Sequence, residues 1–118
     1  MLKEIILPHE SLPFSKAVKS GQLIFVSGLT GKGKNIEEQT RVALNDVKTT
    51  LEKARASLEN VVKTSIFLSD GKDFDSMNKV YKEFFPKDFP ARTTVQASPA
   101  KKEYLIEIEV IAVMPRKR

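Results

Sequence analysis

Only two segments of this chain have the spacing of an amphipathic helix, and strand-like segments surround them. The first runs for about 20 residues after Asn35, with apolar or small side chains three to four positions apart. The second begins at Asp73 or Asp75 and ends before Pro86, which cannot continue a helix. Alternating or continuous apolar runs predict strands at 16–19, 22–28, 61–68, 93–98 and 104–113.

Two helices can cover one face of such a sheet but not both. The fold class that follows is α+β: a mixed sheet of about six strands with two helices on one face. The other face must then be polar or be buried by another subunit, so we expect an oligomer. A chain of 118 residues is one ordinary domain, spanning residues 1–118.

The scarce residue types exclude several kinds of site. The chain has no cysteine and one histidine, His9, which rules out thiol catalysis and multi-histidine metal sites. Its net charge is +5, but Arg116, Lys117 and Arg118 carry three of these charges, so the evidence for a nucleic-acid surface is weak. With no apolar run long enough for a membrane span and no signal peptide, a cytoplasmic location is expected.

The last predicted strand carries two carboxylates on an otherwise apolar face. Alternation places Glu107 and Glu109 on that face. A carboxylate in apolar surroundings needs a cation or a hydrogen-bond donor. If the 99–103 loop joins the last two strands as a hairpin, Arg92 lies opposite Glu109. The same register puts Thr94 opposite Glu107.

Two interpretations of this arrangement are open from the residues alone. In the first, which spacing alone favours, an arginine–glutamate ion pair holds the register of two strands. In the second, Arg92 binds the carboxylate of a small molecule through two parallel hydrogen bonds, and a nearby glutamate moves protons. The segment Gly31-Lys32-Gly33-Lys34 lacks the G-x-x-x-x-G-K-[ST] pattern of a phosphate loop and is expected to be a flexible basic loop.

Five motifs occur in a characteristic order over nearly the whole chain. They are Ile24-Phe-Val-Ser-Gly28, Asn60-Val-Val-Lys-Thr64, Asp73-Phe74 through Asn78 to Tyr81, Phe89-Pro-Ala-Arg-Thr-Thr-Val95 and Ile106-Glu-Ile-Glu-Val-Ile-Ala112. With them the chain resembles the reactive intermediate deaminase A family (RidA, YjgF-like). The resemblance implies a chorismate mutase-like α+β fold. It also implies a homotrimer whose sheets form a central barrel, with a site at each subunit interface.

The resemblance also implies roles for individual residues. Arg92 matches the arginine that binds the substrate carboxylate, and Glu107 matches the glutamate that positions the hydrolytic water. Thr94 stands where many members have cysteine, and the resemblance implies that its backbone helps to hold that water. Further substrate-binding positions are Ser27, Gly28, Asn78 and Phe14. Many members have tyrosine at the position of Phe14, and Leu29 stands in place of a common glutamine, changes that affect substrate range.

The activity implied by the resemblance is hydrolysis of reactive 2-imino acids, such as 2-iminobutanoate and 2-iminopropanoate, to 2-oxo acids and ammonia. It needs neither a cofactor nor a metal. The expected partners are this small-molecule substrate and two further copies of the chain, with no membrane and no nucleic acid. The alternatives are a non-catalytic regulator that binds small metabolites and an RNA-directed protein similar to a ribonuclease or translation inhibitor.

Overall fold

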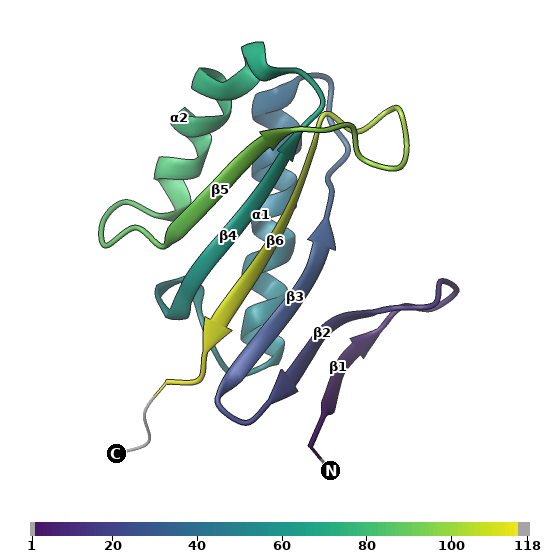
Figure 1. Cartoon of the computed structure of the whole chain (residues 1–118), viewed down its shortest axis with the longest axis vertical. Helices are drawn as coiled ribbons and strands as arrows, with labels where there is room; N and C mark the ends of the chain where they lie inside the picture. The colour runs from purple at the N-terminus through teal and green to yellow at the C-terminus, as the bar shows by residue number, and fades with distance from the viewer. Residues whose placement is uncertain (1, 116–118) are drawn as a thin grey trace.

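The computed structural model describes residues 2–115, which form a twisted six-stranded sheet with two helices against one face (Figure 1). The strands are β1 (Glu4–Pro8), β2 (Ser15–Ser20), β3 (Leu23–Leu29), β4 (Val61–Leu68), β5 (Ala91–Gln96) and β6 (Ile106–Val113). Their order across the sheet is β1-β2-β3-β6-β4-β5, and every neighbouring pair is antiparallel except β4 and β5. The α+β class and the mixed sheet are thus confirmed. The basic residues Arg116, Lys117 and Arg118 lie outside the described residues.

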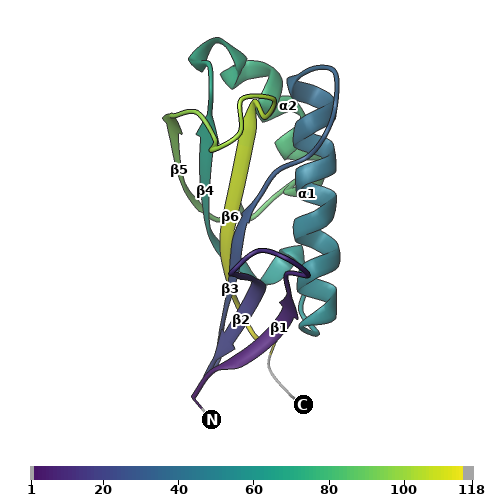
Figure 2. The ribbon, with the colours of Figure 1, turned by 90° about the vertical axis from the view of Figure 1, so that its right-hand side faces the viewer.

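Both helices pack on the same face of the sheet, as predicted (Figure 2). Helix α1 spans Ile36–Lys53, and the Asn35 side chain caps it by accepting a hydrogen bond from the Glu38 N–H at 2.9 Å. Helix α2 spans Phe74–Phe84. Short 3₁₀ turns, η1 (Leu58–Asn60) and η2 (Gly71–Asp73), flank β4. Neither α-helix in residues 2–115 is long and apolar enough to cross a membrane.

The core lies between the helices and one face of the sheet. The predicted apolar face of β6, Ile106, Ile108, Val110 and Ala112, is at most 2% exposed. It meets the apolar face of α1, where Leu44 and other large side chains are fully buried. Burying one such side chain contributes roughly 1.5–3 kcal/mol, so this layer holds the helices on the sheet.

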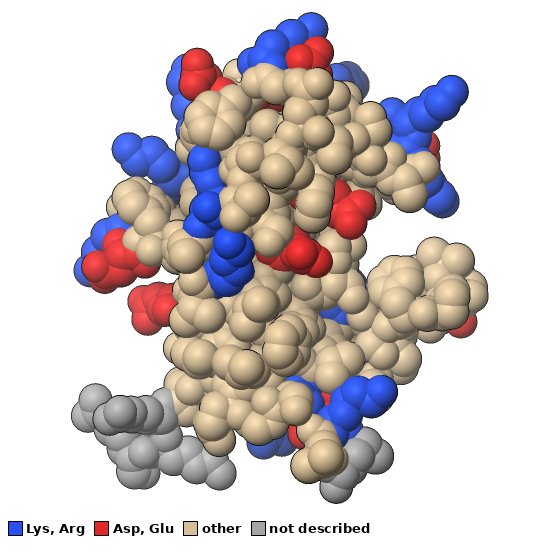
Figure 3. Space-filling view, viewed as in Figure 1, with Lys and Arg blue, Asp and Glu red and all other residues tan. Residues whose placement is uncertain are grey.

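The opposite face of the sheet has no helix over it. Leu23, Phe25 and Val95 are 40%, 42% and 42% exposed there, although all three belong to strands. Figure 3 shows this face. Most of its surface comes from uncharged residues, and a few acidic and basic side chains lie among them. The continuous apolar run of β3 predicted a strand covered on both faces, but within one chain only one face is covered.

The predicted hairpin between the last two strands is wrong, because β4 lies between β5 and β6. Strand β5 instead runs parallel to β4, and α2 makes the crossover that a parallel pair requires. Thr64 of β4 lies beside both Arg92 and Val110, whereas Phe67 lies beside Glu107. Since Thr64 and Phe67 are three positions apart in the strand, Arg92 and Glu107 belong to opposite faces of the sheet.

Candidate active site

The seven predicted site residues fall into two groups. The arginine group lies on the helix-covered face, at the sheet edge formed by β5, and contains Arg92, Thr94 and Asn78. The glutamate group lines a pocket of about 330 Å³ and contains Phe14, Ser27, Gly28 and Glu107. One chain therefore brings the predicted residues together within each group but does not bring the two groups together.

Arg92 is held by α2. Its Nη1 donates a hydrogen bond to Asn78 Oδ1 at 2.7 Å. The guanidinium carbon lies 4.9 Å from the centre of the Tyr81 ring and 5.5 Å from that of Phe74. Phe74, Asn78 and Tyr81 are four and three positions apart, so they share one face of the helix. An amide and two rings thus orient a half-buried guanidinium without neutralising it.

No acidic side chain pairs with Arg92 within residues 2–115, since the three ion pairs there involve other residues. Tyr81 does not supply a negative charge either. Burial raises the pKa of its phenol, and this outweighs the hydrogen bond between the Tyr81 and Thr64 hydroxyls and the positive charge of Arg92, which lower it. The phenol is therefore neutral at pH 7. The predicted ion pair between Arg92 and a glutamate is wrong within the chain, and the arginine keeps donors and charge for another anion.

Thr94 lies on the same strand face as Arg92, two positions further along β5. Its Oγ1 is buried and makes no hydrogen bond within residues 2–115. A buried hydroxyl without a partner costs free energy, so such atoms usually meet water, a ligand or another subunit.

A β-bulge shapes the glutamate group. The pairing of β3 with β6 shifts from Val26 beside Val110 to Leu29 beside Ile108, so Ser27 and Gly28 occupy the bulge. The Ser27 hydroxyl donates to Ser15 O at 2.6 Å, which leaves its lone pairs free. A Cβ atom at Gly28 would overlap the Glu107 carboxylate, so only glycine lets this carboxylate lie against the bulge.

Phe14 reaches the same pocket from the loop between β1 and β2. His9 organises this loop: its Nδ1 accepts hydrogen bonds from the Ser11 and Leu12 N–H groups at 3.1 and 2.9 Å. The His9 ring also packs on the Phe14 ring, with centres 4.8 Å apart. Within residues 2–115 the single histidine thus acts as a loop support rather than as a member of either site group.

Five residues that the sequence interpretation did not assign also line the pocket of Glu107. They are Thr30, Pro99, Ala100, Lys101 and Tyr104. The last four belong to the segment between β5 and β6, which the wrong hairpin treated as a simple connection. The sequence feature that could have identified this segment as part of the pocket is its position directly before the strand that bears Glu107.

The glycine-rich basic loop has a packing role. A Cβ atom at Gly31 would lie 2.7 Å from Gln39 O and from Ala43 N, so glycine is needed for the loop to lie against α1.

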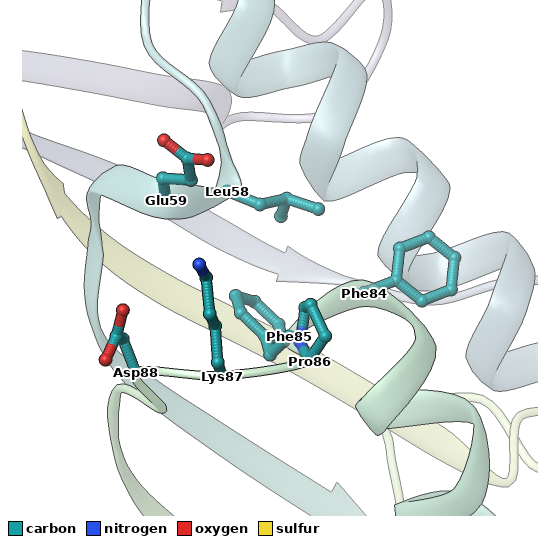
Figure 4. Close-up of a pocket in the computed structure, with 7 residues that line it drawn as sticks. All are labelled: Leu58, Glu59, Phe84, Phe85, Pro86, Lys87 and Asp88. Atoms are coloured by element: carbon teal, nitrogen blue, oxygen red, sulfur yellow. The ribbon is translucent and has the colours of Figure 1, made fainter.

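A separate cavity of about 470 Å³ lies between η1 and the loop that follows α2 (Figure 4). Its lining is Leu58, Glu59, Phe84, Phe85, Pro86, Lys87 and Asp88. It contains none of the seven predicted residues, so it is distinct from both site groups.

Comparison with known proteins agrees with this architecture. A family model described as "Endoribonuclease L-PSP" matches residues 7–114. A "RutC family protein" of Pyrococcus abyssi is 43% identical, over 95% of this chain and 98% of the relative. The human "2-iminobutanoate/2-iminopropanoate deaminase" is 34% identical, over 86% of this chain and 80% of the relative. The chain belongs to the RidA/YjgF family.

The solved structures of relatives extend this RidA-family assignment to the fold. The crystal structure of TdcF from E. coli with bound serine is 30% identical, with a TM-score of 0.86 and coverage of 95% of this chain and 99% of that one. Family and fold are thereby confirmed. The roles of single residues, the trimer and the cytoplasmic location stay predictions for this RidA-family chain.

Proposed function

We propose that this chain is an imine deaminase that hydrolyses 2-imino acids to 2-oxo acids and ammonia. The observation that carries the proposal is Arg92, a half-buried guanidinium that an amide and two rings orient and that no acidic side chain of residues 2–115 neutralises. Such a group is suited to bind the carboxylate of a small substrate. The name of the human relative and the serine bound to TdcF, another small carboxylate, support this substrate class.

The positions of the two site groups favour a site that is shared between two copies of the chain. They lie on opposite faces of the sheet, so one chain cannot place both on one small substrate. Because β5 is an edge strand, Arg92 lies at the rim of the sheet, where a neighbouring copy can approach. We infer that the arginine group of one copy and the glutamate group of the next complete each site.

The proposed reaction is an addition followed by an elimination. Arg92 holds the substrate carboxylate, which fixes the imine carbon toward the pocket of Glu107. Glu107 accepts a hydrogen bond from water and orients it toward that carbon, and the backbone of Thr94 helps to hold the water. Attack forms a C–O bond and moves the imine π electrons to nitrogen. Glu107 transfers one proton from the added oxygen to this nitrogen, which gives a carbinolamine, and then transfers the remaining hydroxyl proton to the same nitrogen. The C–N bond then breaks, and ammonia leaves as the carbonyl of the 2-oxo acid forms.

A coupled assay tests the proposed function. A threonine dehydratase generates 2-iminobutanoate, and release of 2-oxobutanoate is followed with and without this protein. We expect the protein to shorten the lifetime of the imine in proportion to its concentration. An unchanged rate of 2-oxo acid release, with folded and oligomeric protein, would refute the assignment.

We further predict a homotrimer. The exposed apolar face that includes Leu23, Phe25 and Val95 would be buried by neighbouring copies, which would also complete the sites. Light scattering at micromolar concentration should give three times the mass of the chain. A stable monomer that retains full deaminase activity would contradict both the trimer and the shared site.

The RNA-directed alternative has less support from the charges on the sheet. The description of the matching family model names an endoribonuclease. However, among residues 2–115 the sheet face that carries Glu107 and Glu109 has few charged side chains, and these are of both signs (Figure 3). Phosphate backbones are recognised mainly through clustered basic side chains, so the deaminase is the better-supported function.

A further inference from the structure

We propose that Lys101 selects imino acids that carry a second acidic group, so that 2-imino dicarboxylates are good substrates of this chain. The inference rests on the proposed function and specifies its substrate class. It derives from the chemistry of the part of the pocket wall that the segment between β5 and β6 forms.

The pocket of Glu107 combines one cation with one anion. Among its lining residues Lys101 is the only basic side chain and Glu107 the only acidic one. The ring of Phe14 and the side chains of Pro99 and Ala100 supply apolar surface. A ligand that fits this lining has a short carbon chain and an anionic end distant from the reacting carbon.

The wall that carries Lys101 is fixed to the helix layer by Gln39, which is 3% exposed. The Gln39 Nε2 donates to Glu103 O at 3.1 Å and to Gly33 O at 3.2 Å, and its Oε1 accepts from Leu105 N–H at 2.7 Å. One buried amide therefore anchors the residues that follow Lys101 and the glycine-rich loop.

A second anchor lies at the end of the same segment, where Ser69 N–H donates to Leu105 O at 3.0 Å. The backbone at Glu103 and Leu105, two and four positions after Lys101, is thus held from both α1 and the end of β4. A wall that is ordered before binding loses little conformational entropy when a ligand arrives, and this favours selection by Lys101.

The Lys101 ammonium is available to a ligand. None of the three ion pairs within residues 2–115 includes it. In the proposed site Arg92 already holds the carboxylate next to the imine carbon, so Lys101 can bind only a different anionic group. A lysine is a mobile point charge, and it can therefore reach side-chain carboxylates of more than one length.

A different role for Lys101 makes a different prediction. If its ammonium pairs with Glu107 during the reaction, it changes how the glutamate handles protons for every substrate. Replacing Lys101 would then slow the hydrolysis of all imines to the same extent. Selection of the substrate side chain instead predicts a loss confined to dicarboxylates.

The experiment compares Lys101→Ala with Lys102→Ala in the full-length protein. Lys102 is the neighbouring exposed lysine and does not line the pocket, so it controls for the loss of one positive charge. A flavin amino-acid oxidase generates 2-iminobutanoate or 2-iminoglutarate in place, and the imine that survives is trapped with semicarbazide. Titration with the inert 2-oxobutanoate and 2-oxoglutarate measures binding without turnover.

We expect Lys101→Ala to lower kcat/KM for 2-iminoglutarate and affinity for 2-oxoglutarate by roughly tenfold or more, since a charge-assisted hydrogen bond is lost. In the same variant, kcat/KM for 2-iminobutanoate and the affinity for 2-oxobutanoate should each stay within about twofold of the wild-type value. Lys102→Ala should change neither substrate class, and Lys101→Glu should reduce dicarboxylate turnover further.

Two outcomes would overturn the inference in distinguishable ways. If the wild-type protein hydrolyses 2-iminobutanoate but Lys101→Ala slows both imines equally, selection by Lys101 is wrong and the deaminase remains. If the wild-type protein hydrolyses neither imine, the proposed function fails and the inference fails with it.

Discussion

Replacing Arg92 with alanine is expected to abolish measurable turnover of imines that carry a carboxylate and to weaken the binding of inert 2-oxo acids. The guanidinium offers two parallel N–H donors to a carboxylate, and charge-assisted hydrogen bonds contribute roughly 1.5–3 kcal/mol each. The Asn78 amide and the Tyr81 ring already orient the group, so little is lost to ordering on binding. Titration with 2-oxobutanoate and the dehydratase-coupled assay measure the two effects separately.

The matched variant is Arg92→Lys, which keeps the charge but not the two parallel donors, and we expect it to restore little activity. Thermal melts give the second control. The partners of Arg92 in the chain are an amide and two rings, so alanine should cost about 1–2 kcal/mol of stability. Breaking a buried ion pair would instead cost about 3–5 kcal/mol. A loss of that size with unchanged affinity for 2-oxobutanoate would show that Arg92 is structural.

The periodicity of the sequence was sufficient for most of the secondary structure. Strand β4 spans Val61–Leu68 as predicted, and the alternation in β6 correctly separated the buried face from the face of Glu107. Both helices were found because each must bury one stripe of apolar side chains. Strand β1 was missed because it is a short edge strand, largely exposed, whose pattern has no buried face.

Strand order could not be obtained from the same patterns. Alternation shows which side chains share a face, but it does not identify the neighbouring strand. The segment between β5 and β6 permits a hairpin, yet α2 returns the chain so that β5 pairs with β4. The roles of Arg92 and Glu107 therefore stay predictions, whereas the predicted pairing of their strands is wrong. In one chain they lie on opposite faces, and only a second copy could unite them.

Glu107→Gln is expected to preserve the fold and to lower kcat by roughly a hundredfold or more, the range that general acid–base groups contribute. Glutamine keeps the size of the side chain, so the close approach to Gly28 remains possible. It cannot accept a proton from water, and this removes the proposed proton transfer. Because Arg92 still holds the substrate, affinity for 2-oxobutanoate should stay within a few-fold, so the loss should fall on kcat rather than on binding.

Glu109→Gln is the matched control for this change. Glu109 lies on the same face of β6, two positions away, but it is exposed, sits beside Ser65 and does not line the pocket of Phe14 and Gly28. The two variants remove the same charge from the same strand, so any general electrostatic or folding effect should appear in both. A site built around the bulge predicts that Glu109→Gln keeps most of the activity. Equal losses of kcat in the two variants would show that the negative charge of this face, rather than a carboxylate placed against Gly28, supports the reaction.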